Sequence, residues 1–239
     1  MKFAFPVPEV SSVPVANSDE QFPVRRIYCV GRNYAEHARE MGHDPQRESP
    51  FFFAKPADAI VANGATIQYP LATQNFHHEI ELVVAIGREG VNIAPEVALE
   101  HVYGYAVGID LTRRDLQLAA RDKGRPWEAG KGFDASAPIS AIRRASDIGH
   151  PSSGPIWLKV NGETRQSSDL AQLLWPVPDV IAQLSKLFTL VPGDLIFTGT
   201  PAGVGPLVPG DRVLGAIAGV GELSLEIASE APARTQNPA

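Results

Sequence analysis

Glycine and proline interrupt this sequence at short intervals, and their spacing limits the length of any regular element. The 239 residues include 21 Gly and 21 Pro, which favours short strands joined by shaped turns over long helices. Apolar runs at 51–54, 79–87 and 102–110 are typical of buried strands. The best amphipathic helix spans 177–190. The sequence therefore predicts a β-rich α+β protein with few, short helices.

Two segments of unequal size follow from the pattern of residues. Residues 1–23 are rich in Pro, Val and Ser and lack helical periodicity. We expect them to form a small extended appendage, which could be a hairpin on the main body. Residues 24–239 make up the main domain, and a hydrophobic content of 44% is ample for its core.

Charge and cysteine content narrow the class of protein. The formal net charge is -6, so the chain lacks the basic excess that neutralises phosphates, and no nucleic-acid partner is expected. The single cysteine, Cys29, cannot form an internal disulfide, and its apolar neighbours favour a buried structural thiol. The N-terminus does not resemble a signal peptide, and no apolar stretch is long enough to span a membrane. We therefore expect a cytoplasmic protein with no membrane partner.

Two glutamates interrupt the apolar run at 79–87. Glu79 and Glu81 are two residues apart, so their carboxylates point to the same face of a strand. This face could be exposed to solvent, but residues 83–86 continue without polar alternation, which favours a sheet that is covered on both sides. Buried side by side, the two carboxylates repel each other and require a compensating charge.

Asp110 ends the second long run and supplies a third carboxylate. Three carboxylates at strand positions form an oxygen-rich site suited to Mg²⁺ or Mn²⁺. Two alternatives stay open: Asp110 could cap a helix expected at 111–120, and His77 and His78 could belong to a zinc site. Adjacent residues of a strand point to opposite faces, so we favour a metal site made of carboxylates alone.

Three further motifs each have a functional interpretation that must be weighed against an ordinary one. His37 and Glu40 are three residues apart on a helix expected at 34–41, where a glutamate can orient a histidine as a general base. The same pair on an exposed helix is only a solvated face. Lys131 lies between two glycines and is either held against a ligand or an ordinary loop lysine. The glycine-rich run at 198–205 could hold an anion with its backbone N–H groups, but it lacks the lysine of a nucleotide-binding loop.

Seven ordered blocks give the sequence a resemblance to the fumarylacetoacetate hydrolase family. They are GRNYAEH (31–37), FAKP (53–56), HEIEL (78–82), GIDLTRRD (108–115), GKGF (130–133), LKVNG (158–162) and TGTPAGVG (198–205). The similarity runs from about Arg26 to the C-terminal strands. It is greatest to the short acylpyruvate and fumarylpyruvate hydrolases of the family.

This resemblance implies a fold, a cofactor and roles for particular residues. The fold is a mixed β-roll, usually dimeric, and the cofactor is Mg²⁺ or Mn²⁺. The implied ligands of the metal are Glu79, Glu81 and Asp110. The implied catalytic residues are His37, Glu40 and Lys131, and Arg114, Gln117 and Thr200 match family positions that contact the oxo-acid. Arg32 is also expected to bind the substrate, because its positive charge suits a dicarboxylate. The segment 42–50 is longer than in compact relatives and could act as a lid.

The activity that the resemblance implies is hydrolysis of a carbon–carbon bond in a 2,4-dioxo acid. The expected substrate is fumarylpyruvate, which aromatic catabolism provides and which would give fumarate and pyruvate. Alternatives are decarboxylation or tautomerisation of oxaloacetate or a related oxo-diacid, and an oxo-acid-binding metalloprotein without turnover. An attacking water needs a base, so His37 and Glu40 favour hydrolysis, although a base also serves enolisation.

Overall fold

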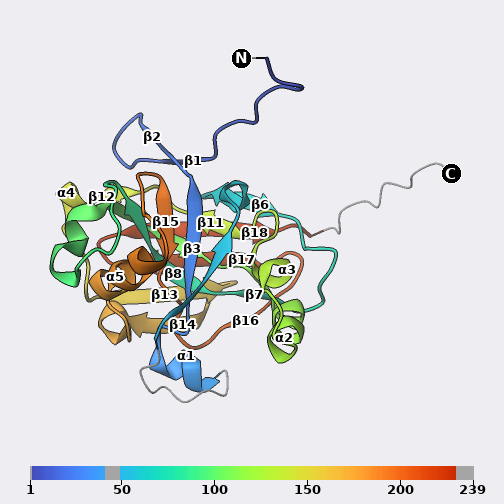
Figure 1. Ribbon diagram of the computed structural model, residues 1–239. Helices are drawn as coiled ribbons and strands as arrows, with labels where there is room; N and C mark the ends of the chain where they lie inside the picture. The colour runs from blue at the N-terminus through green and yellow to red at the C-terminus, as the bar shows by residue number, and fades with distance from the viewer. Residues whose placement is uncertain (1, 41–48, 230–239) are drawn as a thin grey trace.

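Strands dominate the computed structural model, which describes residues 2–40 and 49–229 and leaves the side chains of 38–40 outside its description. Its longest helices are α2 (Arg114–Asp122) and α5 (Val177–Leu187), and α5 corresponds to the helix predicted at 177–190. The strands belong to four sheets, and the other helices are short (Figure 1). The β-rich α+β class is confirmed.

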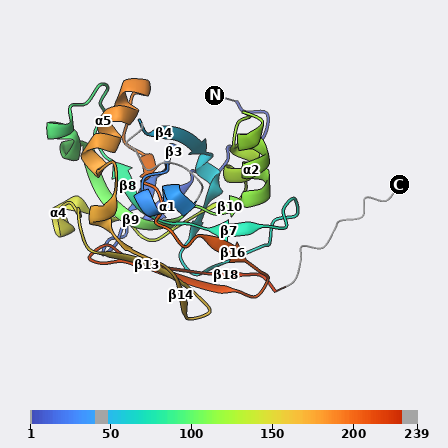
Figure 2. The same ribbon diagram turned by 90° about the horizontal axis from the view of Figure 1, so that it is seen from below.

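The largest sheet has eight strands and curls around one side of the molecule (Figure 2). In spatial order it contains β4 (Phe51–Lys55), β3 (Arg26–Gly31), β15 (Asp194–Phe197), β8 (Ile80–Ile86), β9 (Val102–Ile109), β11 (Ala137–Ile139) and β5 (Ile60–Ala62), with β12 (Arg143–Arg144) also paired to β9. The strand β8 is central and antiparallel to both neighbours, whereas β3 and β15 are parallel. The sheet is therefore mixed, as the family resemblance implies.

A five-stranded, mostly antiparallel layer packs beneath the large sheet (Figure 2). It contains β14 (Glu163–Asp169), β13 (Pro155–Val160), β17 (Arg212–Ile217), β18 (Gly221–Ile227) and, parallel to β18, β6 (Ala65–Ile67). Asn161 and Gly162 connect β13 to β14, both with positive φ, as a tight hairpin turn requires. A smaller sheet contains β10 (Thr112–Arg113), β7 (Phe76–His78) and β16 (Gly205–Leu207).

Side chains of β8 alternate between two hydrophobic cores. Leu82 and Val84 belong to the larger core, which the five-stranded sheet shares. Val83 and Ala85 belong to a second core on the opposite face. All residues of β8 are buried, so the prediction of a sheet covered on both sides is confirmed. The absence of polar alternation in 82–86 follows from this double burial.

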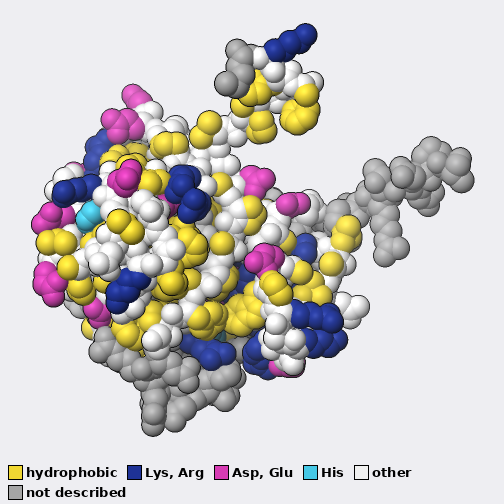
Figure 3. Space-filling model, in the orientation of Figure 1, with side chains coloured by type: hydrophobic (Ala, Val, Ile, Leu, Met, Phe, Trp, Pro, Cys, Tyr) yellow, Lys and Arg dark blue, Asp and Glu magenta, His cyan; other side chains and the backbone are white. Residues whose placement is uncertain are grey.

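The second core is covered in part by a hairpin of β1 (Ser12–Pro14) and β2 (Gln21–Pro23). Val13 and Phe22 of this hairpin are buried in that core. The preceding residues stand away from the body (Figures 1 and 3), and their side chains Phe3 and Phe5 are exposed. Residues 12–23 thus contribute to packing, while the preceding segment does not.

The remaining helices are α1 (Ala35–Glu40), η1 (Ala57–Ala59), η2 (Pro95–His101), α3 (Glu128–Lys131), α4 (Ala145–Ile148) and η3 (Leu170–Gln172). None of the helices in the described part of the chain is both long and apolar enough to cross a membrane. The helix predicted at 111–120 begins only at Arg114, because Leu111 is buried in the larger core and β10 pairs with β7. The proposed lid at 42–50 lies almost wholly outside the described residues.

Candidate metal and substrate site

The three carboxylates predicted to bind a metal meet at one place in the large sheet. Glu79 directly precedes β8, Glu81 lies within it, and Asp110 directly follows β9. The antiparallel pairing of these strands brings them together, and the backbone N–H of Asp110 donates to the carbonyl of Glu79 at 2.8 Å. One oxygen from each carboxylate lies within 4.8 Å of the others.

Burial and local geometry decide between the alternatives for these carboxylates. Glu79, Glu81 and Asp110 are 5%, 2% and 0% exposed, so they do not lie on a solvated sheet face. The N-cap position of α2 is Arg113, so Asp110 does not cap that helix. The carboxylates form a buried acidic site, which requires compensating positive charge.

His77 and His78 contact other groups than this carboxylate cluster. His77 Nε2 lies 2.7 Å from Asn75 Oδ1, and the Nε of Arg114 donates to His77 Nδ1 at 3.4 Å. His78 Nδ1 is 3.1 Å from Gln166 Oε1. Burial, followed by the charge of Arg114, lowers the pKa of His77 to about 4. The group of possible metal ligands found among the described residues is the carboxylate set, without either histidine.

Lys131 and Lys55 compensate part of the negative charge. All three donors of the Lys131 ammonium are used: its Nζ donates to Glu79 Oε2 at 2.9 Å, to Asp110 Oδ2 at 2.6 Å and to Thr112 Oγ1 at 2.7 Å. Lys55 Nζ forms an ion pair with Asp110 Oδ1 at 2.8 Å. Lys131 is 2% exposed and is therefore not an ordinary loop lysine.

The charge balance differs between the two glutamates. Burial alone would raise the pKa of Glu79, but Lys131 and Arg114 outweigh it and hold that pKa well below its ordinary value. Burial, together with the charges of Asp110 and Glu79, raises the pKa of Glu81 well above its ordinary value. Among the described side chains, those of residues 2–37 and 49–229, no ion pair reaches Glu81. Three oxygen donors around incompletely compensated charge fit a hard divalent cation.

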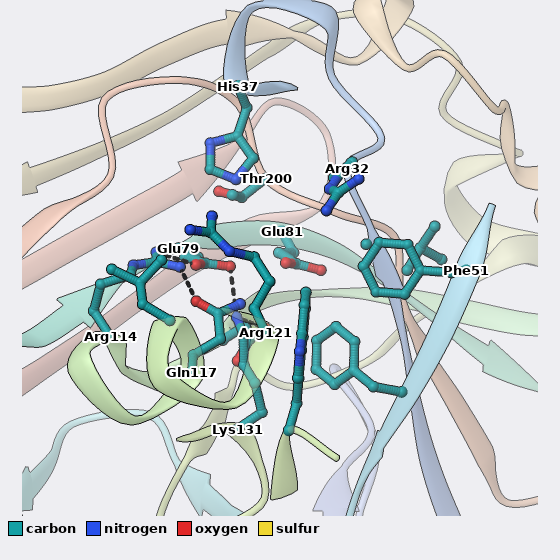
Figure 4. Close-up of a pocket in the computed structure, with 16 residues that line it drawn as sticks. Arg32, His37, Phe51, Glu79, Glu81, Arg114, Gln117, Arg121, Lys131 and Thr200 are labelled. Atoms are coloured by element: carbon teal, nitrogen blue, oxygen red, sulfur yellow. Dashed lines mark hydrogen bonds and ion pairs between the residues drawn. The ribbon is translucent and has the colours of Figure 1, made fainter. Parts of the chain in front are cut away.

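The helix α2 contributes one face to the pocket above the carboxylates (Figure 4). Arg114, Gln117, Leu118 and Arg121 line the pocket and are spaced by three, four and seven residues from Arg114, as one helical face requires. Arg114 donates to a carboxylate oxygen of Glu79 and to Gln117 Oε1. Because Gln117 Oε1 already accepts a hydrogen bond from Arg114, the amide NH₂ of Gln117 is the group available to a ligand.

An aromatic wall closes the side of the pocket opposite α2 (Figure 4). The rings of Phe51 and Trp127 meet edge to face, with centroids 5.1 Å apart, and Phe53 lies beside Trp127. The Arg32 guanidinium lies over the Phe51 ring, 5.4 Å from its centroid. The wall can accept an apolar portion of a ligand, and the arginine an anionic end.

His37 and Thr200 line the same pocket. His37 is only 7% exposed, so it does not lie on a solvated helix face. The Thr200 hydroxyl donates to the carbonyl of Ile80 at 2.8 Å. The side chain of Glu40, the predicted partner of His37, lies outside the described part of the structure.

The glycine-rich segment at 198–205 contacts the protein's own carboxylate. The backbone N–H of Gly199 donates to Glu81 Oε2 at 2.7 Å. Gly199 has a φ of 96°, and a Cβ there would lie 2.7 Å from the Cβ of Asn33, so glycine is required. The N–H group expected to bind a ligand anion therefore orients a candidate metal ligand.

Comparisons with known proteins agree with this geometry. The model of the fumarylacetoacetate (FAA) hydrolase C-terminal family matches residues 26–228. The chain belongs to the fumarylacetoacetate hydrolase family. Among solved structures of the family, fumarylpyruvate hydrolase from Pseudomonas aeruginosa, in complex with Mn²⁺ and pyruvate, has a TM-score of 0.94 and 56% identity, over 96% of this chain and 100% of that chain.

Curated relatives include proteins of two different activities. Fumarylpyruvate hydrolase of Ralstonia sp is 47% identical over 184 residues, which are 77% of this chain and 95% of the relative. Human mitochondrial oxaloacetate tautomerase is 40% identical over 203 residues, which are 85% of this chain and 91% of the relative. Both alignments cover most of the length of the relative.

The structure brings together nearly all of the residues singled out in the sequence. The pocket is lined by Arg32, His37, Glu79, Glu81, Asp110, Arg114, Gln117, Lys131 and Thr200. Sequence reasoning missed Arg121 and the aromatic wall. A signal for Arg121 existed, because it lies seven residues after Arg114 on a helical pattern, whereas Trp127 lies in a connection without periodicity.

Proposed function

We propose that this protein is a metal-dependent hydrolase that cleaves fumarylpyruvate to fumarate and pyruvate. The observation that carries the proposal is the buried set of Glu79, Glu81 and Asp110 at the base of a pocket that also contains His37. Mg²⁺ or Mn²⁺ held by this set supplies positive charge that stabilises the enolate of pyruvate as it leaves. The Mn²⁺ and pyruvate in the Pseudomonas aeruginosa relative support the same assignment.

The residues of the chain divide the remaining work. His37 accepts a proton from the water that attacks the C4 carbonyl of the substrate, and Glu40 orients His37. Water adds its oxygen to C4, the C3–C4 bond breaks, and a proton transferred to C3 completes pyruvate. The amide NH₂ of Gln117 binds the pyruvate end of the substrate. Lys131 and Arg114 hold Glu79 in its ionised form.

The distal half of fumarylpyruvate suits the outer part of the pocket. This half is an apolar alkene that ends in a carboxylate. Phe51 and Trp127 provide the apolar surface, while Arg32 and Arg121 provide positive charge. Lys and Arg side chains also gather at the end of the molecule where α2 lies (Figure 3), which attracts a dianion although the protein as a whole is acidic.

A substrate panel tests the proposal. Fumarylpyruvate, acetylpyruvate and oxaloacetate are incubated with the protein and Mn²⁺ or Mg²⁺, and again with a chelator. Loss of enol absorbance and release of pyruvate are followed separately. We expect metal-dependent pyruvate release that is fastest from fumarylpyruvate. Turnover of oxaloacetate without any cleavage of fumarylpyruvate would instead support the tautomerase activity of the 40%-identical relatives.

We also propose that the protein is a homodimer and that it is located in the cytoplasm. A homodimer is expected from the family resemblance. The described chain has one cysteine, Cys29, which is a buried free thiol, as is typical of the reducing cytoplasm.

A further inference from the structure

Gln166 is a fully buried side chain of β14 that reaches from the five-stranded sheet to the carboxylate strand. Its Oε1 accepts from the backbone N–H of Ile80 at 3.1 Å and lies 3.1 Å from His78 Nδ1. Its Nε2 donates to Thr200 Oγ1 and to the carbonyl of Pro201, both at 2.8 Å. A buried amide with partners at both ends is held rigidly in one position.

These partners determine which way the amide faces. The N–H of Ile80 can only donate and the carbonyl of Pro201 can only accept, so the oxygen and nitrogen of Gln166 cannot be exchanged. His78 must then donate its Nδ1 proton to Gln166. Thr200 accepts from Gln166 and gives its own proton to the carbonyl of Ile80. The hydroxyl orientation of Thr200 is therefore a consequence of Gln166.

Ile80 is the residue between the two glutamates of the carboxylate set. Along this edge of β8, pairing with β15 reaches Val83, and the backbone N–H of Thr198 still donates to the carbonyl of Leu82 at 3.0 Å. At Ile80, side chains replace the strand partner: the backbone N–H donates to Gln166, and the backbone carbonyl accepts from Thr200. The backbone direction at this residue sets the directions of both glutamates.

We propose that Gln166 is a positioning residue for the metal site. It holds Ile80 directly and through Thr200, and thereby sets the relative orientation of the carboxylates of Glu79 and Glu81. This inference rests on the proposed metal-dependent function, but not on the identity of the substrate. Groups that are hydrogen-bonded directly to metal ligands commonly affect metal affinity or activity by about 10- to 100-fold. Gln166 acts through Ile80, one residue further away, so the lower end of this range, about 10-fold, is expected.

The test replaces Gln166 by Met, which has a similar length but no amide. Titration calorimetry with Mn²⁺ alone is expected to give a dissociation constant raised about 10-fold. At saturating Mn²⁺, kcat is expected to fall while KM changes much less. The matched control is Val213→Ala. Val213 is 2% exposed in the larger core, belongs to the five-stranded sheet that also contains Gln166, and does not line the pocket above the carboxylates. A merely structural loss lowers stability in both variants and leaves Mn²⁺ affinity unchanged.

A second variant keeps the inference testable if the first does not fold. Gln166→Glu retains an oxygen for the N–H of Ile80 but carries at most one proton, so it cannot donate to both Pro201 and Thr200, and its Mn²⁺ affinity and kcat should also be reduced. Wild-type Mn²⁺ affinity and kcat in the folded variants would overturn the positioning role. Absence of turnover in the wild-type protein would count against the proposed hydrolase instead, while the Mn²⁺ titration would still judge Gln166.

Discussion

Glu81 has the least compensated charge of the three carboxylates, and its proton makes metal binding depend on pH. Burial and the neighbouring carboxylates raise the pKa of Glu81, so below the raised value Glu81 carries a proton that a cation must displace. We expect Mn²⁺ binding to release this proton and to strengthen as pH rises toward that value. Calorimetry in two buffers with different ionisation enthalpies measures the released protons.

The comparison for this measurement is Glu81→Gln, whose side chain does not ionise: it should bind Mn²⁺ more weakly and, at the higher Mn²⁺ concentrations that binding then requires, release no proton from this position. Binding without proton release by the wild-type protein would show that Glu81 is already ionised, contrary to the charge balance described above.

Arg121 should decide whether the enzyme prefers a substrate with a distal carboxylate. Replacement by Leu removes a charged partner that contributes about 1.5–3 kcal/mol, so kcat/KM for fumarylpyruvate should fall about 10- to 100-fold. Acetylpyruvate has no distal carboxylate and should be affected little. The matched control is Arg125→Leu, since Arg125 is exposed just beyond α2 and does not line the pocket. Equal losses for both substrates would refute this role for Arg121.

At the scale of elements, the hairpin of β1 and β2 should contribute measurably to stability. Phe22 is 6% exposed and lies against Tyr103, with ring centroids 5.3 Å apart. Phe22→Ala should lower the free energy of unfolding by about 3 kcal/mol, measured by urea denaturation. Val10 is 70% exposed, and Val10→Ala should have no effect. An unchanged stability in Phe22→Ala would mean that the hairpin is dispensable.

The sequence predicts the central strands well, because their residues carry the signal themselves. The run at 79–87 corresponds to β8 at Ile80–Ile86, and its lack of polar alternation predicts that it is buried on both faces. Thr112 and Arg113 were misassigned to a helix, because their pairing with β7 depends on residues about 36 positions away. Local periodicity carries no information about such a partner.

The site was predictable where local spacing or the family blocks marked it, and hidden elsewhere. Strand spacing alone predicts that Glu79 and Glu81 lie on the same face. Lys131 is marked as a site residue by its family block. Gln166 lies in an exposed-looking polar stretch, and its contact with Ile80 spans 86 positions of sequence. The wall residue Trp127 likewise meets Phe51 only in the folded chain.

At the scale of the whole molecule, the protein should assemble as a dimer. Residues 2–10 expose Phe3, Phe5, Val7 and Val10, an apolar surface that a monomer would leave in water. Light scattering after size exclusion should give about twice the chain mass of 25.6 kDa. A mass of one chain at every concentration would contradict the expected assembly.

The most direct test of the central claim is product release by the wild-type protein and by Glu81→Gln, with fumarylpyruvate and Mn²⁺. Fumarate and pyruvate are quantified together with bound metal. The wild-type protein should release one fumarate for each pyruvate and lose this activity with a chelator, while Glu81→Gln should bind Mn²⁺ poorly and release neither product. Undiminished release of both products by metal-stripped Glu81→Gln would contradict the account.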